Sequence, residues 1–210
     1  MSKGKLLVIS GFSGVGKGTV LDCLKSKYNN YKISVSATTR QPRNEEVHGV
    51  NYYYISKEEF EEMINNNQLL EHALYLDNYY GTPRKFVEEQ LSNGINVILE
   101  IEIKGALQIK KIMPESYLIF ILPPSAEELK SRLVGRNTES AEKIFERLAK
   151  AAEEAQYIDN YDYYVINENN KTEQCADNIN KIVTDTNPEL VDDKFVEKIK
   201  HDVKMFVEGE

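Results

Sequence analysis

The sequence contains only two cysteines, no tryptophan and three histidines among its 210 residues. Cys23 and Cys175 match no metal-ligand spacing, and a disulfide between them is not expected in a reducing compartment. The longest apolar run is far shorter than the roughly 20 residues that span a bilayer, so we predict no transmembrane helix. The N-terminus lacks the apolar stretch of a signal peptide. We therefore expect a cytoplasmic protein with no membrane partner.

Basic residues are in the minority: 26 Lys and Arg stand against 34 Asp and Glu, which gives a formal net charge of −8. This balance argues against a surface that binds nucleic acid over a wide area, although a local basic pocket remains compatible with it. Hydrophobic residues make up 41% and charged residues 29%, which are ordinary values for a globular protein. The length predicts one domain, or one core with small inserted subdomains.

Four short apolar runs have the composition of strands buried in a parallel sheet, and helical patterns stand between them. The predicted strands are Leu6–Ile9, Ile95–Leu99, Tyr117–Leu122 and Tyr163–Ile166, and the predicted helices are Thr19–Lys27, Pro83–Ser92, Ala126–Val134 and Ser140–Tyr157. Strands that alternate with helices form parallel sheets covered on both faces. We therefore predict an α/β fold with a mostly parallel, doubly wound sheet.

Two segments depart from this alternation. Residues 34–82 are rich in Tyr, Ser and Thr with alternating apolar positions, which is typical of short strands, and a helix with capping chemistry at Ser56 runs through Asn65. We interpret this segment as an inserted β-rich subdomain. After Asp185, apolar residues with rough helical spacing predict a C-terminal amphipathic helix; they are Leu190, Phe195, Ile199, Val203 and Phe206.

A glycine-rich turn follows the first predicted strand and precedes the first helix. It reads Gly11-Phe12-Ser13-Gly14-Val15-Gly16-Lys17-Gly18-Thr19 and fits the P-loop pattern G-x-x-x-x-G-K in the expected strand-to-helix context. Its glycines let consecutive backbone N–H groups point inward, and the helix N-terminus and Lys17 add positive charge. The loop is therefore predicted to cradle the phosphates of a nucleoside triphosphate. Gly18 stands where a strict P-loop has Ser or Thr, so that the nearest hydroxyl is on Thr19.

A second pattern lies in the inserted segment. Ser-x-Thr-Thr-Arg-x-Pro-Arg occupies residues 36–43 as Ser-Ala-Thr-Thr-Arg-Gln-Pro-Arg, and Tyr79-Tyr80-Gly81-Thr82 follows further on. Together with the P-loop, this spacing resembles the guanylate kinase family, the ATP:GMP phosphotransferases, from about Lys5 to about Ile182. Two arginines three residues apart also suit a phosphate group, because the guanidinium fork matches phosphate oxygens.

The resemblance implies a complete architecture and an activity. It implies a P-loop NTPase core at residues 1–33, 83–125 and 149–185, a GMP-binding subdomain at 34–82, a helical lid at 126–148 and a C-terminal helical extension at 186–210. The expected reaction transfers the γ-phosphoryl group of ATP to GMP, and to dGMP, with Mg²⁺ as cofactor. The expected partners are these small nucleotides, and a homo-oligomer is left open.

The resemblance also implies an acceptor-nucleotide site. The GMP phosphate would be held by Ser36, Arg40, Arg43, Tyr52 and Tyr80. Glu71 and Thr82 would read the guanine base, since one carboxylate can accept hydrogen bonds from the ring N–H and the exocyclic amine of guanine. Adenine would present a ring lone pair to the same carboxylate and be repelled. Glu102 stands where relatives usually have Asp and would join this site.

The donor site implied by the resemblance takes in the loop residues Gly11, Ser13, Gly14, Val15, Gly16, Lys17, Gly18 and Thr19, together with Arg132 and Asn167. Arginines of the lid, Arg136 and Arg147, would act on the transferring phosphoryl group with Lys17 and Arg40 as the catalytic set. Thr19 and Glu100 are candidate magnesium ligands acting through water. The i, i+4 spacing of Glu128 and Arg132 is equally typical of a surface salt bridge.

Two other functions fit parts of the sequence. A scaffold domain can keep this fold without catalysis and bind protein ligands, but the intact P-loop lysine and arginine pair argue against it. The loop motif Gly16-Lys17-Gly18-Thr19 would also suit another nucleoside monophosphate kinase. The histidines form no cluster, which agrees with a reaction that needs no general base.

Overall fold

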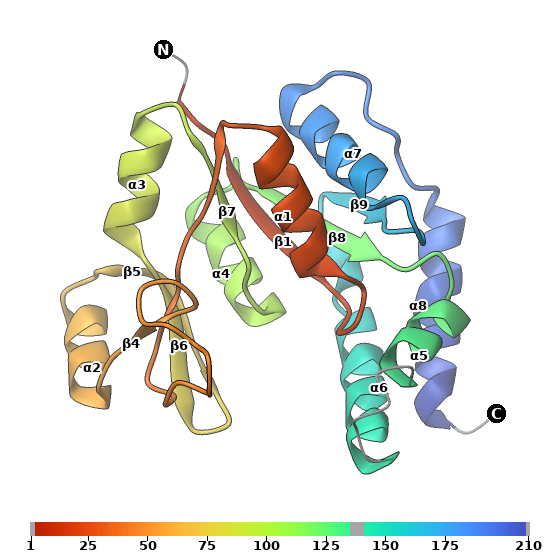
Figure 1. Cartoon of the computed structure of the whole chain (residues 1–210), viewed down its shortest axis with the longest axis horizontal. Helices are drawn as coiled ribbons and strands as arrows, with labels where there is room; N and C mark the ends of the chain where they lie inside the picture. Colours follow the sequence, from red (N-terminus) through yellow and green to blue (C-terminus); the bar gives the residue numbers. More distant parts are fainter. Residues whose placement is uncertain (1–2, 135–140, 209–210) are drawn as a thin grey trace. The chain divides into compact units, whose positions relative to one another are not determined.

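The structure is a computed structural model that describes residues 3–134 and 141–208 (Figure 1). The chain divides into two compact units. The first unit comprises the chain up to Val8 together with Asn30–Ser116, and the second comprises Ile9–Asn29 and the chain from Tyr117 onward. Strand β1 (Leu6–Gly11) contributes residues to both units.

The first unit contains a set of short parallel strands in the order β2–β7–β1. Strand β7 (Asn96–Leu99) pairs with β2 (Tyr31–Ile33) on one side and with the start of β1 on the other, so that Ile98 lies opposite Ile33 and Leu7. All four residues of β7 are buried, as expected for a strand covered on both faces. Helices α3 (Arg84–Ser92) and α4 (Ile103–Ile112) flank β7 in the chain.

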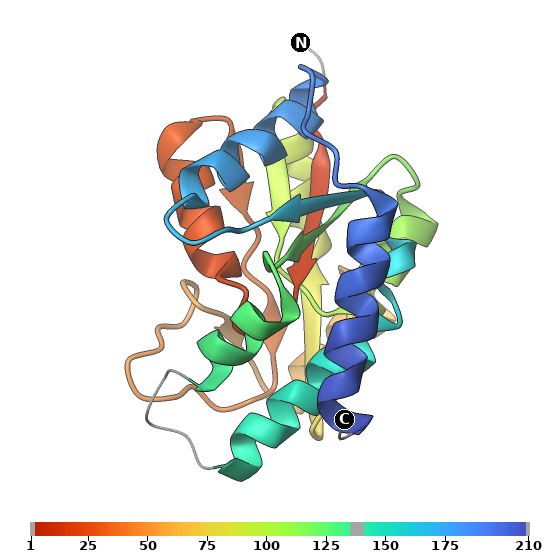
Figure 2. The same ribbon diagram turned by 90° about the vertical axis from the view of Figure 1, so that its right-hand side faces the viewer.

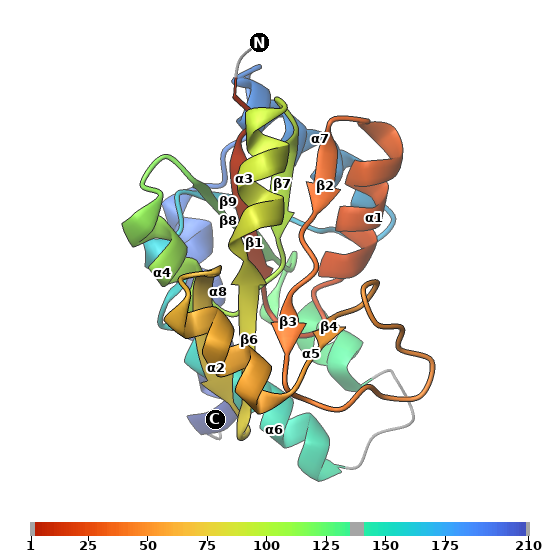
Figure 3. The ribbon, with the colours of Figure 1, turned by 90° about the vertical axis from the view of Figure 1, so that its left-hand side faces the viewer.

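The same unit contains a four-stranded sheet built from the inserted segment (Figure 3). The strand order is β4–β3–β6–β5, with β4 (Tyr53–Tyr54), β3 (Ala37–Thr38), β6 (Asn78–Pro83) and β5 (Leu69–Tyr75). Helix α2 (Lys57–Asn65) packs on this sheet through Phe60, whose ring stacks on Tyr79 at 5.1 Å between centroids. Ala37, Phe60 and Leu69 form the buried centre of this small core.

The second unit is mainly helical. It holds α1 (Lys17–Lys27), β8 (Tyr117–Leu122), α5 (Ala126–Val134), α6 (Ala141–Ala155), a single 3₁₀ turn at Ile158–Asn160, β9 (Tyr163–Ile166), α7 (Thr172–Thr184) and α8 (Asp193–Glu208). Strands β8 and β9 are parallel, with Phe120 opposite Tyr164. Helices α1 and α7 are joined by an ionic cluster in which Lys27 Nζ donates to Glu173 and Asp177 at 2.6 and 2.9 Å.

The C-terminal helix α8 lies along α6, as Figure 2 shows, and its apolar face is buried. Val196, Ile199 and Val203 are nearly inaccessible to solvent. Toward α5, Phe206 receives the Lys130 ammonium over its ring at 5.6 Å from the centroid. The predicted C-terminal amphipathic helix is therefore confirmed, and it is docked on the two helices of the expected lid segment.

The predicted mostly parallel α/β architecture is confirmed, as are the four predicted strands and the helices, with ends shifted by two residues or fewer. Helices α4 and α7 had not been predicted. Cys175 is buried, which raises the pKa of its thiol to about 12, whereas Cys23 is only half-buried. Among the described residues, no helix is long and apolar enough to cross a membrane. The division into core, subdomain, lid and extension stays a prediction.

Helix α2 begins with a complete capping box, and this generates a stability prediction. Ser56 Oγ accepts a hydrogen bond from Glu59 N at 3.1 Å, and the Glu59 carboxylate accepts one from Ser56 N at 2.8 Å. Replacing Ser56 with Ala should lower the free energy of unfolding by about 1 kcal/mol, measured by urea denaturation. Glu62→Gln, on the exposed face of the same helix, should change it by less than about 0.5 kcal/mol. Equal losses in the two variants would contradict a specific role of the cap.

Candidate active site

The P-loop connects β1 to α1 in the second unit, and two of its glycines adopt a backbone conformation that other residues rarely reach. Gly14 has φ 84° and Gly16 has φ 87°. A Cβ at Gly14 would lie 2.8 Å from Leu133 Cδ2, and one at Gly16 would lie 2.7 Å from Asn167 Nδ2. Both positions therefore require glycine for conformation and for space. Helix α1 begins at Lys17, directly after this curled segment.

The Val15 carbonyl oxygen links the loop to residues from the C-terminal half of the chain. The Val15 oxygen accepts hydrogen bonds from Asn167 Nδ2 at 2.8 Å and from Arg132 at 3.2 Å. Arg132 also donates to the Asn167 carbonyl oxygen at 3.1 Å, so the three residues form a closed set. Within the loop, Val15 N donates to the Phe12 carbonyl oxygen at 3.1 Å, so both polar backbone groups of Val15 are bonded. Arg132 and Asn167, both predicted at the donor site, thus reach the loop from the C-terminal half of the chain.

Arg132 forms the surface salt bridge as well. Its Nε lies 3.0 Å from Glu128 Oε1, and Asn169 Nδ2 donates to the same oxygen at 2.8 Å. Hydrogen bonds from Asn169 and Arg132 hold the pKa of the Glu128 carboxyl below its usual value. The two interpretations of Arg132 are therefore compatible, because one guanidinium contacts both the salt-bridge partner and the loop.

The remaining donor-site residues have these positions. Gly11 ends β1, Ser13 and Lys17 are half-buried, and Gly18 and Thr19 are exposed in the first turn of α1. Space around Gly18 is open, so a side chain there would meet no neighbouring atom. Arg147 is half-buried on α6, whereas Arg136 lies outside the described residues. Asn167 is 5% exposed, and its Oδ1 accepts no hydrogen bond within the described part of the chain.

The predicted acceptor-phosphate residues lie in the first unit, around Arg40. The Arg40 guanidinium carbon is 5.5 Å from the centre of the Tyr52 ring, and the Tyr52 and Tyr80 rings are 6.0 Å apart. Tyr80 also hydrogen-bonds the Arg40 side chain. Burial is the main cause that raises the pKa of Tyr52. Ser36 directly precedes β3, and its carbonyl oxygen accepts from Tyr53 N at 2.9 Å.

The end of the Arg40 side chain is paired with an acid, Glu46, that was not among the predicted site residues. Its two terminal nitrogens lie 3.0 Å from the two carboxylate oxygens of Glu46. The backbone N–H of Arg43 donates to Glu46 at 2.7 Å, and the Tyr54 hydroxyl donates to it at 2.9 Å. The side chain of Arg43 itself is exposed. The arginine pair is thus organised around one carboxylate.

Glu71 on β5 is a buried carboxylic acid with 5% of its surface exposed. The Thr82 hydroxyl on β6 donates to Glu71 Oε1 at 2.7 Å, and the Thr82 backbone N–H also bonds this carboxylate. Burial raises the pKa of Glu71 to about 7, and the two bonds from Thr82 oppose that rise. The structure therefore brings together the two residues that were predicted to read the base.

The second oxygen of Glu71 lies against the first turn of α4. An added Cβ at Gly105 would be 2.5 Å from Glu71 Oε2 and 3.0 Å from Glu71 Cδ. The carboxylate thus occupies the space that a side chain at residue 105 would need. Gln108, one turn further on, bonds both the N–H and the carbonyl of His72, which fixes α4 beside β5.

The two acids after β7 have exposed side chains. Glu100 follows the last residue of the strand, and Glu102 is the N-cap residue of α4. The negative charge of Glu100 is one of the causes that raise the pKa of the Tyr52 phenol. Among the described residues, no three His, Cys, Asp or Glu side chains gather as a metal-binding group.

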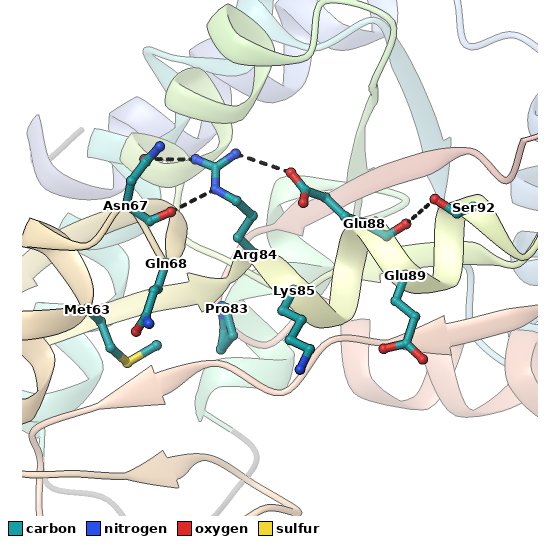
Figure 4. Close-up of a pocket in the computed structure, with 9 residues that line it drawn as sticks. All are labelled: Met63, Asn67, Gln68, Pro83, Arg84, Lys85, Glu88, Glu89 and Ser92. Atoms are coloured by element: carbon teal, nitrogen blue, oxygen red, sulfur yellow. Dashed lines mark hydrogen bonds and ion pairs between the residues drawn. The ribbon is translucent and has the colours of Figure 1, made fainter.

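A separate open pocket in the first unit contains none of the predicted site residues (Figure 4). It is lined by Met63, Asn67, Gln68, Pro83, Arg84, Lys85, Glu88, Glu89 and Ser92. Arg84 is held there by Asn67 and by the carbonyl oxygen of Leu69 at 3.1 Å, and it pairs with Glu88. These bonds join the start of α3 to the turn before β5, so the arginine has a structural explanation.

Glu46, Tyr54 and Gly105 had not been singled out from the sequence. A signal for Glu46 existed in its spacing, because it follows Arg43 by the same three residues that separate Arg43 from Arg40. Gly105 could have been noticed as a glycine inside a helix, which costs stability unless packing requires it. Tyr54 had no distinguishing signal among 13 tyrosines.

The glycine-rich loop, its helix and the mostly parallel sheet define a protein of the P-loop class, which binds nucleotide phosphates. Residues 3–186 match the family described as guanylate kinase. The chain belongs to the guanylate kinase family.

Individual relatives agree with this assignment. The chain is 54% identical over 172 residues to a guanylate kinase of Clostridioides difficile strain 630, covering 82% of this chain and 84% of the relative. It is 47% identical over 206 residues to a guanylate kinase of Lactococcus lactis subsp. lactis strain IL1403, covering 97% and 98%. A crystal structure of guanylate kinase from Anaplasma phagocytophilum has a TM-score of 0.68 and 35% identity, covering 88% and 86%.

The raised pKa of Glu71 generates a prediction about stability and pH. Below the ordinary value of 4.5 the carboxyl is protonated in both the folded and unfolded states, and stability is lost as the pH rises through the folded value of about 7. Glu71→Gln has no carboxyl to ionise and so avoids this loss. The free energy of unfolding of the variant, relative to that of the wild type, should therefore increase between pH 4.5 and 8. The gain should be on the order of 1–3 kcal/mol, measured by urea denaturation across that range. A stability difference that stays constant with pH would contradict the prediction, and Glu62→Gln is the surface control.

Proposed function

We propose that this protein transfers the γ-phosphoryl group of ATP to GMP, and to dGMP, and so forms ADP and the diphosphate. The observation that carries the proposal is the buried pair of Glu71 and Thr82, 2.7 Å apart, in the same unit as the Arg40 cluster. A buried carboxylate that selects a base and an arginine that attracts a phosphate together describe a nucleoside monophosphate site. The P-loop in the other unit supplies the donor site.

Selection of guanine follows from hydrogen-bond chemistry. An ionised Glu71 accepts from the ring N–H and the exocyclic amine of guanine, while Thr82 keeps the carboxylate in place. Adenine places a ring lone pair against that carboxylate and leaves it unpaired in a buried site, which is costly. A site built on buried hydrogen bonds can discriminate by ~10⁴-fold, against ~10²-fold for an apolar pocket. Glu102, at the start of α4, is a further proposed contact.

The acceptor phosphate binds to Arg40 and Arg43 with the hydroxyls of Ser36, Tyr52 and Tyr80. Guanidinium groups suit this task because their paired N–H donors match two phosphate oxygens. The phosphate itself is the nucleophile. Its second pKa is about 6, by analogy with phosphorylated side chains, so that it is mostly dianionic at neutral pH and needs no general base.

The donor triphosphate binds to the P-loop N–H groups and to Lys17, at the positive end of α1. Arg132 and Asn167 fix the loop by donating hydrogen bonds to the Val15 carbonyl oxygen. Asn167 Oδ1 is buried and accepts no hydrogen bond in the described residues, and Asn167 is proposed to lie near the base of the donor nucleotide. Arg136 and Arg147 are proposed to neutralise the charge on the transferring phosphoryl group.

Catalysis consists mainly of positioning and charge neutralisation. Two polyanions must be held in line, and their repulsion must be offset by Lys17 and the arginines. The transferred group moves from the β-phosphate oxygen of ATP to a phosphate oxygen of GMP, with no proton transfer to a side chain. Excluding water from the bound nucleotides prevents hydrolysis of ATP.

The available donor groups fit Mg²⁺. Mg²⁺ keeps several waters and uses one or two carboxylates plus substrate phosphates, so a full protein cage is not needed. Glu100 at the end of β7 and Thr19 in the first turn of α1 are the residues proposed to hold it, through water. When bound, the ion would neutralise charge on the β- and γ-phosphates. The proposal further includes the cytoplasm as location and excludes nucleic acid and membranes as partners.

An acceptor panel tests the proposal. With ATP as donor, a coupled assay of ADP formation should show turnover of GMP and dGMP and at least ~10²-fold lower kcat/KM for AMP and UMP. Lys17→Ala should reduce turnover by ~10²-fold or more while the chain stays folded, because a full charge at the donor phosphates is lost. Comparable rates with AMP would indicate another monophosphate kinase. No turnover of any acceptor would favour a binding module.

Gly105 provides a second test, specific to the base site. In Gly105→Ala the new Cβ would have to displace the Glu71 carboxylate, since Glu71 Oε2 would lie 2.5 Å away. Alanine is favoured over glycine in helices by about 0.5–1 kcal/mol, so the free energy of unfolding should not fall by more than about 1 kcal/mol. The value of kcat/KM for GMP should nevertheless fall ~10-fold or more.

The matched control for Gly105→Ala is Lys104→Ala, an exposed neighbour on the same helix. Its kcat/KM for GMP should remain near that of the wild type. Normal kinetics in Gly105→Ala would show that the position of the Glu71 carboxylate does not determine acceptor recognition.

A further inference from the structure

Glu46 and Gln41 engage the end-on edge of the Arg40 guanidinium, and Tyr80 hydrogen-bonds the guanidinium as well. An arginine has five N–H donors, which form an end-on fork between the two terminal nitrogens and a side-on fork that includes Nε. Glu46 occupies the end-on fork with both oxygens at 3.0 Å. A further N–H of Nη1 donates to the Gln41 carbonyl oxygen at 2.8 Å.

The donors that these contacts do not use are Nε–H and the second N–H of Nη2, which together make the side-on fork. This fork has the geometry that matches two oxygens of a phosphate. Tyr80, one of the residues proposed to bind the acceptor phosphate, hydrogen-bonds the same guanidinium. Glu46 and Gln41 therefore engage the end-on edge of Arg40, and a phosphate would share the remaining donors with Tyr80.

Glu46 is itself held from two further directions. Arg43 N donates to Oε2 at 2.7 Å and the Tyr54 hydroxyl donates to the same oxygen at 2.9 Å. These donors, with Arg40 first among them, hold the pKa of Glu46 at about 2, so it is ionised throughout the physiological range. The rings of Tyr52 and Tyr54, 5.5 and 5.8 Å from the guanidinium carbon, restrict Arg40 further.

We propose that Glu46 is a positioning residue for the acceptor phosphate, which fixes the Arg40 guanidinium and the Arg43 backbone before the nucleotide binds. This inference rests on the proposed function, in which Arg40 contacts the GMP phosphate. Arginine has one of the largest side-chain entropies to lose on ordering, and a guanidinium that is already fixed loses less when the phosphate binds.

Removing Glu46 has two opposing effects on phosphate binding, and the geometry decides between them. The loss of a negative charge raises the local positive charge, which alone would favour an anion. The loss of the carboxylate also frees Arg40 from the ion pair that directs its side-on fork. Because the carboxylate engages the end-on edge of Arg40 and anchors three separate groups, we expect loss of positioning to be the larger effect.

Comparing GMP with guanosine isolates the phosphate contribution from recognition of the base. The dissociation constants of both ligands are measured by calorimetry for the wild type, Glu46→Ala, Glu46→Gln and Glu45→Gln. In Glu46→Ala the ratio of the guanosine constant to the GMP constant should fall ~10-fold or more, with guanosine affinity unchanged. Glu46→Gln should show a smaller fall, because its amide oxygen still accepts from Arg40. Glu45→Gln removes the same charge from an exposed neighbour and should keep the wild-type ratio.

Steady-state kinetics provide the second measurement. In Glu46→Ala the KM for GMP should rise ~10-fold or more, while the KM for ATP stays the same and kcat falls by a smaller factor. Equal loss of GMP and guanosine affinity would overturn the inference in favour of a general structural role. A ratio that increases would overturn it too, since Glu46 would then compete with the phosphate. If the wild-type protein turns over GMP but binds guanosine as tightly as GMP, only the positioning inference fails. Absence of GMP turnover would reject the proposed function.

Discussion

The carboxylate of Glu71 is the constraint on which the packing of the first unit around β5 depends, because a buried acid requires both donors and space. Its donors come from Thr82 on the neighbouring antiparallel strand, so the pairing of β5 with β6 fixes one oxygen. Its space comes from the missing side chain of Gly105, so the placement of α4 fixes the other. The hydrogen bonds between Gln108 and His72 then hold helix and strand together. Several ordinary features of packing therefore converge on one functional group.

The two proposed nucleotide sites, one in each unit, would bind anions by different physical means. The P-loop relies on backbone N–H groups and the end of a helix, and its side-chain support acts on a single carbonyl, that of Val15. The proposed acceptor site in the first unit would rely on arginine side chains, which are flexible and have to be fixed by other residues. Glu46 and the tyrosines provide that restraint around Arg40. A chain of net charge −8 can thus bind highly charged nucleotides, because the few cations are concentrated and held in defined orientations.

Features that are local in the sequence could be predicted, and features made by distant contacts could not. The P-loop and the capping box of α2 are set by residues within a few positions of one another, and the buried strands are continuous apolar runs. Helix α4 was not predicted because Gly105 lies in its first turn and weakens the helical pattern, and that glycine is explained only once Glu71 is placed beside it. The pairing of Glu71 with Thr82 was anticipated through the family's motifs alone, since 11 residues and a hairpin separate them.

Glu46 and Glu71 show how environment assigns opposite properties to the same side chain within one unit. Glu46 is surrounded by N–H and O–H donors, and its pKa of about 2 keeps it charged at any physiological pH. Glu71 receives hydrogen bonds from Thr82 and is largely desolvated. Its pKa of about 7 means that it is only partly ionised at neutral pH. The charge of Glu46, proposed to position the phosphate-binding arginine, is therefore insensitive to pH, whereas the charge of Glu71, proposed to read the base, is not. A base with two hydrogen-bond donors stabilises the ionised form of Glu71, so binding of the correct nucleotide itself offsets part of the cost of burying that charge.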